Sequence, residues 1–239
     1  MDENELFERL GKIEVREGKE RQIKSYVLRN NTLEEKDREV VRNYFDKYGL
    51  FYTGEPFDKE KVFGNNKPLI IEIGFGMGDT TAKMALIKGE NNYLGLEVYL
   101  QGYIKLLKNL GDNNIDNVRI MRFNAVDVLE NMIADGSVDG FHVFFPDPWP
   151  KKKHHKRRLM NPEFLHLLAT KLRKGGYIYM VTDWEEYAEE VLEIERREPL
   201  LTNPFYSFAP PVTWRPVTKF EQKGMEKEYT INELWFERV

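Results

Sequence analysis

The sequence contains no cysteine, and this absence excludes several kinds of chemistry. Without thiols the chain has no disulfide, no thiolate metal site and no cysteine nucleophile. It also lacks any apolar run approaching the ~20 residues that a membrane-spanning helix needs. The N-terminal stretch MDENELFERLGKIEVREGKE is polar and rich in acids, unlike a signal peptide or a transit peptide. We therefore expect a soluble, cytoplasmic protein with no membrane partner.

The composition is that of a folded domain with an excess of acid. Hydrophobic residues make up 41% of the 239 positions and aromatic residues 13%, so general disorder is not expected. A chain of this length fits one globular domain, or one domain with an extension. The formal net charge is −4, so any affinity for nucleic acid has to come from a local cluster of basic residues.

Two regions of the chain differ in charge content and in the pattern of apolar residues. Residues 1–66 are highly charged with mixed signs, and the stretch TLEEKDREVVRNYFDKYGL has apolar residues at helical spacing after Thr32, its expected N-cap. From residue 67 onward, short apolar runs alternate with helical patterns. We predict a charged, partly helical N-terminal extension over 1–66 and a main domain over 67–239.

Strands alternate with helices along the main domain. Strands are expected over 68–74, 92–98, 117–125, 140–147, 177–183 and 229–239, and helices over 79–89, 99–111, 161–174 and 184–198. Asp79 or Thr80 should cap the first of these helices, Asn161 the third, and Gly175 should follow the third. This alternation predicts an α/β fold with a mostly parallel sheet and helices on both faces. Ligands of such sheets bind beyond the carboxyl ends of the strands.

The glycine loop EIGFGMGD follows the first of these strands. Gly74, Gly76 and Gly78 have the E-x-G-x-G-x-G spacing that resembles S-adenosylmethionine-dependent methyltransferases. A dinucleotide fingerprint needs its last glycine where Asp79 stands, which disfavours an NAD dehydrogenase. The glycines allow a tight turn and close contact with a nucleoside, and Glu72 is placed to face an ammonium group. The alternative is a plain strand-to-helix turn with no ligand.

Two further polar residues stand at strand ends. Glu97 ends the next strand, ~20 residues beyond the loop, where an acid can accept hydrogen bonds from ribose hydroxyls. Asn124 follows the third strand, and its amide carries both a donor and an acceptor for an adenine edge. The alternatives are a solvated charge for Glu97 and a turn residue for Asn124.

The stretch GFHVFFPDPWPKKKHHKRR joins a buried strand to a dense basic run. Pro146 and Pro148 restrict the backbone on either side of Asp147, which holds this carboxylate at the edge of the sheet. The Lys and Arg residues that follow can supply phosphate contacts, although a block of like charge is more often a solvated loop. His154 and His155 are adjacent, so their side chains diverge, and no carboxylate joins them. We therefore expect no metal site.

Across most of its length the sequence resembles the bacterial tRNA (guanine-N7-)-methyltransferases. The resemblance is carried by EIGFGMG, FFPDPWPKKKHHKRR, TDW, RPVTKFEQKGM and the N-terminal SYVLRNNTL. It implies a seven-stranded Rossmann-like methyltransferase fold. It also implies transfer of the methyl group of S-adenosylmethionine to N7 of guanine 46 in the tRNA variable loop. Members of the family differ in oligomeric state, so both a monomer and a homodimer stay open.

The resemblance also assigns residues to roles. The cofactor positions are Glu72, Gly74, Gly76, Gly78, Glu97, Asn124, Ala125 and Asp147. The positions assigned to the substrate are Lys151, Asp183, Thr218, Lys219, Phe220 and Glu221. RNA contact is assigned to Lys153, His154, His155, Lys156, Arg157 and Arg158. Asp147 is also the catalytic position, Arg215 is expected to hold phosphate, and Asn124 departs from the Asp that many relatives carry.

Two rival functions agree with parts of this pattern. One is a methyltransferase that acts on DNA, protein or a small molecule, although an Asp between prolines before a basic tract fits these substrates less well. The other is an RNA-binding protein without activity on a methyltransferase scaffold. The intact glycine loop and Glu97 argue against the second rival.

Overall fold

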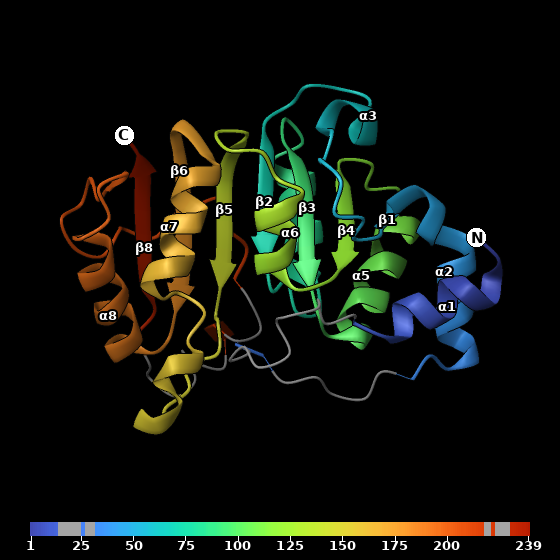
Figure 1. Cartoon of the computed structure of the whole chain (residues 1–239), viewed down its shortest axis with the longest axis horizontal. Coiled ribbons are helices and arrows are strands. Elements are labelled where there is room, and N and C mark those ends of the chain that lie inside the picture. Colours follow the sequence, from blue (N-terminus) through green and yellow to red (C-terminus); the bar gives the residue numbers. More distant parts are fainter. Residues whose placement is uncertain (14–24, 27–31, 218–220, 223–229) are drawn as a thin grey trace.

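One mixed sheet organises the chain in this computed structural model, which describes residues 1–13, 25–26, 32–217, 221–222 and 230–239 (Figure 1). The order of its strands is β1-β4-β3-β2-β5-β6-β8-β7. The strands are β1 (Gly49–Leu50), β2 (Leu69–Ile73), β3 (Asn92–Glu97), β4 (Val118–Arg122), β5 (Val138–Phe144), β6 (Leu172–Thr182), β7 (Leu201–Thr202) and β8 (Asn232–Arg238). The helices are α1 (Glu3–Gly11), α2 (Glu35–Tyr48), α3 (Lys59–Phe63), α4 (Asp79–Ile87), α5 (Leu100–Asp112), α6 (Ala125–Asn131), the 3-10 helix η1 (Lys152–Arg157), α7 (Pro162–Lys171) and α8 (Glu185–Glu195).

The predicted α/β class is confirmed, with one more strand than the seven expected. Strands β1 to β6 pair in parallel, and β8 pairs antiparallel with β6 and β7. The sequence placed six of the eight strands, and the two that it did not place are the edge strands. These are β1, which pairs with β4 through Gly49 opposite Ile120, and β7, which pairs with β8. The sequence placed residues 49–50 at the end of a helix, because two residues are too few to show a strand period.

Helices cover both faces of the sheet and bury its centre. All five residues of β2 are buried, as expected for a central parallel strand. Helices α6, α7 and α8 pack on one face, and Figure 1 shows α6 and α7 in front of the sheet. Helices α2, α4 and α5 contribute to the core on the other face. Figure 1 also shows β3, β4 and β5 ending at one edge, while β8 runs the opposite way.

Several helix ends differ from their predicted positions. Helix α2 is capped by Glu34, which forms a capping box with Asp37, so Thr32 is not its N-cap. Gly78, with φ of +73°, caps α4 in place of Asp79 or Thr80. Asn161 caps α7 as predicted, since its side chain accepts from the N–H of Phe164 at 2.9 Å.

The end of α7 was predicted wrongly. The helix ends at Lys171 and β6 begins at the next residue, so Gly175 lies inside β6 rather than after a helix. The pairing of β6 with β5 shifts between Val138 and Gly140, and Gly175 has φ of +71° in that irregular segment. In the sequence, a glycine that adopts positive φ inside an irregular strand cannot be distinguished from a glycine that ends a helix.

The N-terminal part contacts the main sheet domain at several points. Helix α2 packs against α5, and the side chain of Arg122 in β4 donates to the carbonyl of Leu10 in α1. The boundary expected after residue 66 stays a prediction. Within the described ranges, no helix is both long and apolar enough to cross a membrane.

Candidate active site

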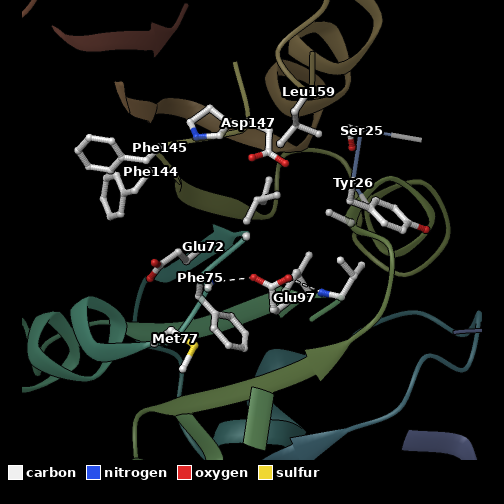
Figure 2. A pocket seen from close by; sticks show the side chains of 18 of the residues that line it. Ser25, Tyr26, Glu72, Phe75, Met77, Glu97, Phe144, Phe145, Asp147 and Leu159 are labelled. Atoms are coloured by element: carbon white, nitrogen blue, oxygen red, sulfur yellow. Dashed lines mark hydrogen bonds between the residues drawn. The ribbon is translucent and has the colours of Figure 1, made fainter. Parts of the chain in front are cut away.

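A cavity of about 310 Å³ lies beyond the carboxyl ends of β2, β3, β4 and β5 (Figure 2). Its walls come from the ends of these strands and the segments that follow them, together with Ser25, Tyr26 and Leu159. All eight residues expected at the cofactor line it: Glu72, Gly74, Gly76, Gly78, Glu97, Asn124, Ala125 and Asp147. The parallel arrangement brings these residues together, although they span 76 positions from 72 to 147 of the sequence.

The glycine loop packs tightly against α5. Gly74, Gly76 and Gly78 all have positive φ, of +74°, +57° and +73°. A Cβ atom on Gly78 would lie 2.5 Å from Cβ of Leu106, and one on Gly102 would lie 2.0 Å from the carbonyl oxygen of Gly76. Glycine is therefore required on both sides of this contact, for conformation in the loop and for space in the helix.

Glu97 ties the end of β3 to the glycine loop. Its carboxylate accepts hydrogen bonds from the backbone N–H groups of Gly76 at 2.7 Å, Val98 at 2.6 Å and Tyr99 at 2.9 Å. Burial raises the pKa of Glu97, and these three N–H groups oppose the rise by stabilising the charged form. A carboxylate has about four lone-pair positions, so it can accept further donors from a ligand.

Glu72 supplies a second buried carboxyl group. The residue is 2% exposed, and its Oε2 has no hydrogen-bond partner among the described residues. Burial raises the pKa of Glu72 to about 7, and the nearby charge of Glu97 also raises it. An isolated buried carboxylate is costly, so a cationic ligand group at this position would offset that cost.

Asn124 is engaged locally by the start of α6. Its Oδ1 accepts from the N–H of Val126 at 3.2 Å, and its Nδ2 donates to Oδ2 of Asp127 at 2.8 Å. Asp127 is 4% exposed and was not singled out in the sequence. The side chain of Asn124 thus serves as the N-cap of α6, which agrees with the alternative interpretation of Asn124 as a turn residue. The same residue also lines the cavity.

Asp147 lies on the side of the cavity opposite Glu72 and Glu97, as Figure 2 shows. It is exposed, in a turn where Phe145 has φ of +50° and Trp149 has φ of +45°. Such values cost bulky residues of the order of 1–3 kcal/mol each and persist only where the surroundings enforce them. The turn is therefore strained on both sides of its carboxylate.

The basic run forms η1 directly after this turn. The side chains of Lys151, Lys152, Lys153 and Lys156 are exposed, whereas His154, His155 and Arg157 are half-buried. The guanidinium of Arg157 stacks 3.9 Å over the ring of Trp149. Arg158 is 2% exposed and is bound inside the fold, so the structure does not place it for RNA contact.

Of the residues expected at the substrate, the three that the structure describes do not line the cavity. Lys151 is exposed beside the turn, and Asp183 is half-buried after β6. Glu221 is buried, and both of its oxygens accept from the guanidinium of Arg215. Thr218, Lys219 and Phe220 lie outside the described residues.

Arg215 does not have the position of a phosphate ligand. Besides Glu221, its guanidinium donates to Glu233 at 3.0 Å and to the hydroxyl of Tyr179 at 2.8 Å. Its side chain is 3% exposed. The expectation that Arg215 binds phosphate is therefore wrong in this arrangement, because two carboxylates already neutralise the cation.

Ser25 and Tyr26 line the cavity and were not predicted as site residues. Trp149 Nε1 donates to the carbonyl of Ser25 at 3.3 Å, and Arg157 donates to the carbonyl of Tyr26 at 3.0 Å. The stretch SYVLRNNTL contributed to the family resemblance, so a signal was present, but nothing in its pattern indicated a place in the cavity wall. Among the described residues, no group of three or more metal-ligating side chains is placed to hold an ion.

Comparisons with known proteins agree with this site. The family model Methyltransf_4, described as "Putative methyltransferase", matches residues 66–234. A tRNA (guanine-N(7)-)-methyltransferase of Neisseria meningitidis serogroup C is 44% identical over 222 residues, 93% of each chain. The protein of the same name from Methylobacillus flagellatus is 43% identical over 232 residues, which cover 97% of this chain and 96% of that one.

Solved structures support the fold alone. The 16S rRNA methyltransferase KamB has a TM-score of 0.55 at 12% identity and covers 77% of this chain and 96% of its own. A 30S ribosomal A1408 methyltransferase from an uncultured bacterium has a TM-score of 0.52 at 16% identity, over 77% of this chain and 96% of that one. With the near-full-length relatives above, these comparisons confirm the resemblance seen in the motifs. The chain belongs to the tRNA (guanine-N(7)-)-methyltransferase family.

Proposed function

We propose that this protein transfers the methyl group of S-adenosylmethionine to N7 of guanine 46 in the variable loop of tRNA. The observation that carries the proposal is the cavity lined by all eight expected cofactor positions, with a row of exposed lysines directly after its Asp147 turn. Because tRNA is the substrate, we propose that the protein acts in the cytoplasm.

The residues of the cavity fit S-adenosylmethionine better than a dinucleotide. Glu72 is buried beside the glycine loop, where it can pair with the ammonium group of an amino acid moiety. Glu97 can accept from ribose hydroxyls in addition to the three backbone groups it holds. At the start of α4, Asp79 stands where a dinucleotide fingerprint has its last glycine, and it pairs with Lys105 at 2.7 Å. When bound, the cofactor supplies an electrophilic methyl group.

Asp147 is the residue we assign to catalysis. Guanine N7 has a lone pair in its neutral form, so the reaction needs alignment rather than a strong base. The methylated ring is cationic, and a carboxylate beside it stabilises the developing charge. A carboxylate can also accept from the N1 and exocyclic amine donors of guanine, which adenine does not present in that pattern. Asp183, after the neighbouring strand, is the second acid available for this recognition.

The exposed lysines of η1 and its flank supply the affinity for RNA. Lys151, Lys152, Lys153 and Lys156 lie next to the catalytic turn in a protein whose net charge is negative. Screening limits repulsion from distant acids, because the Debye length is ~8 Å at physiological salt. The RNA is thus attracted to one place on the surface. Guanine 46 then has to leave its tertiary contacts to reach the cavity.

The test is methyl transfer from labelled S-adenosylmethionine to an unmodified tRNA transcript, with the product mapped by N7-specific strand cleavage. A single product at guanine 46, lost when that base is changed to adenine, is the expected result. A transcript in which a different guanine of the variable loop is replaced serves as the control. Cofactor binding without transfer to any tRNA would contradict the proposal and favour a different methyl acceptor.

A further inference from the structure

Arg158 ends the basic run, but its side chain lies inside the protein. It is among the largest fully buried side chains of the described residues, whereas Lys153 and Lys156 of the same run are exposed. A cation at this depth cannot meet an RNA phosphate in the folded state. Its role is therefore given by the groups that it touches.

The guanidinium of Arg158 joins the catalytic turn to helix α8. Its Nε donates to the carbonyl oxygen of Pro148 at 2.9 Å, and its Nη1 pairs with the carboxylate of Glu190. Its Nη2 lies 3.6 Å from Oε1 of Glu186 and 3.2 Å from Nε2 of His155. The planar fork of an arginine can bind a carbonyl and a carboxylate at once, which the single ammonium of a lysine cannot do in the same geometry.

The turn that Arg158 holds has few hydrogen-bond donors of its own. Pro146, Pro148 and Pro150 have no backbone N–H, so three positions of the segment offer no donor that could close a turn. Phe145 and Trp149 are both in the left-handed region of backbone conformation. Strain of this kind persists only where surrounding contacts enforce it.

Besides the contacts of the Trp149 ring with Ser25 and Arg157, a backbone contact lies on each side of Asp147. On the strand side, the N–H of Phe145 donates to the carbonyl of Val181 in β6 at 2.7 Å. On the other side, the carbonyl of Pro148 accepts from Arg158. The backbone that carries Asp147 is thus attached to a strand on one side and to a buried arginine on the other.

We propose that Arg158 is a positioning residue, which holds the Asp147 turn against α8 and so fixes the carboxylate at the cofactor cavity. The proposal rests on the proposed function, in which Asp147 is the catalytic group. Helix α8 begins two residues after Asp183, so the same arginine also links the two loops that carry the acids. Leu159, the next residue in the chain, lines the cavity itself.

The decisive variant is Glu190→Gln, which removes the main partner of Arg158 without changing the basic run. The carboxyl of Glu190 is partly exposed, so the fold should tolerate the change. Displacement of the turn should lower kcat roughly tenfold, since small misplacements of reacting groups cost up to ~10²-fold. The KM for tRNA should stay unchanged. The control is Glu189→Gln, an exposed neighbour on α8 with the same charge change, and its kcat should match the parent.

The opposite result has a distinct signature. If Arg158 binds RNA, Glu190→Gln frees it, so tRNA should bind more tightly while kcat stays at the parent value. A second variant, Arg158→Gln, should leave the dependence of log affinity on log salt unchanged. A slope that falls by about 0.7–0.9 would indicate a lost phosphate contact and would overturn the proposal. Thermal melts show whether Arg158→Gln folds. If it does not fold, the results for Glu190→Gln decide between the two roles.

Calorimetry with S-adenosylhomocysteine separates this proposal from the proposed function. This measurement needs no RNA. It reports on the turn because Asp147 and Leu159 both line the cavity. Glu190→Gln should weaken this binding at least threefold relative to Glu189→Gln, and equal affinities would count against the positioning role. A parent protein that binds S-adenosylhomocysteine but methylates no tRNA would contradict the proposed function alone.

Discussion

The carboxylate of Glu97 accepts a hydrogen bond from the backbone N–H of Gly76 at 2.7 Å, so the acid that ends β3 holds the glycine loop that follows β2. The other oxygen of the same carboxylate accepts from Val98 and Tyr99. One side chain therefore fixes two neighbouring strand ends at the cavity. This relationship makes Glu97 a structural part of the loop as well as a candidate for binding ribose.

Replacing Glu97 with Gln should weaken cofactor binding while leaving the fold intact. The amide group of Gln has one oxygen, and its NH₂ cannot accept from the Gly76 N–H. We expect S-adenosylhomocysteine affinity to fall at least tenfold, because hydrogen bonds to a charged acceptor contribute ~1.5–3 kcal/mol. Calorimetry measures this, and Glu90→Gln in the exposed turn before β3 is the matched control. Equal affinities for both variants would contradict the role of Glu97.

Cofactor binding should strengthen as the pH rises through about 7, because burial raises the pKa of Glu72 to that value. Below pH 7 the carboxyl is protonated and cannot pair with an ammonium group. Glu72→Gln should bind S-adenosylhomocysteine more weakly at pH 8 and should lose the part of the pH dependence that Glu72 causes. Calorimetry between pH 6 and pH 8 tests this. An unchanged pH profile in Glu72→Gln would assign the dependence to the ligand.

The same shift predicts a pH effect on the stability of the ligand-free protein. The folded state binds the Glu72 proton up to about pH 7, whereas the unfolded chain releases it near 4.5. The contribution of this group to stability is therefore complete below 4.5 and is lost as the pH rises through 7. Urea unfolding of the parent should show a steeper loss across this range than unfolding of Glu72→Gln. Parallel curves would argue against a neutral buried Glu72.

Gly102→Ala should displace the glycine loop. Its new Cβ would lie 2.0 Å from the carbonyl oxygen of Gly76, a backbone atom that cannot move without the loop. We expect a loss of about 1–3 kcal/mol in the free energy of unfolding, the usual cost of overpacking, together with weaker cofactor binding. Gly89→Ala is the control, because nothing lies within 4 Å of its added Cβ. Urea titration of both variants provides the comparison.

Lys153→Ala and Lys156→Ala should each weaken tRNA binding through lost phosphate contacts. Each change should lower the slope of log affinity against log salt by about 0.7–0.9 per contact. Lys174→Ala removes the same charge from the exposed start of β6, at the opposite end of the strands from the cavity. This variant should leave the slope unchanged. Equal slopes for all three variants would place the RNA on another surface.

Asp147→Asn should lower kcat by roughly 10²- to 10³-fold, the range found when one electrostatic stabiliser of a transition state is removed. The amide keeps the shape of the side chain but does not stabilise a cationic ring. Affinity for S-adenosylhomocysteine should fall far less than kcat does, since Asp147 is one exposed group among many in the cavity wall. Single-turnover methylation separates the chemical step from binding, and turnover near the parent value would exclude Asp147 from catalysis.

The sequence by itself determined the α/β class and the order of strands β2 to β6 and β8 with helices α4, α5, α7 and α8, whereas α6 and β7 were missed. It also singled out the residues proposed for the cofactor, all of which line one cavity. Each of these follows from local signals: apolar runs, helical spacing, and polar residues placed directly after strands. The strand that begins with Gly49 and the position of Gly175 were misread, because a two-residue strand and an irregular strand glycine have no local signature of their own.

Only the tertiary structure decided which charged residues are free to bind a ligand. Arg157, Arg158 and Arg215 look alike as sequence letters, yet the first stacks on Trp149 and the other two are buried beside carboxylates. The partner of Arg158 is Glu190, 32 positions away, and Glu233 joins Arg215 from 18 positions away. Burial and pairing depend on contacts between distant segments, which no local pattern of side chains encodes.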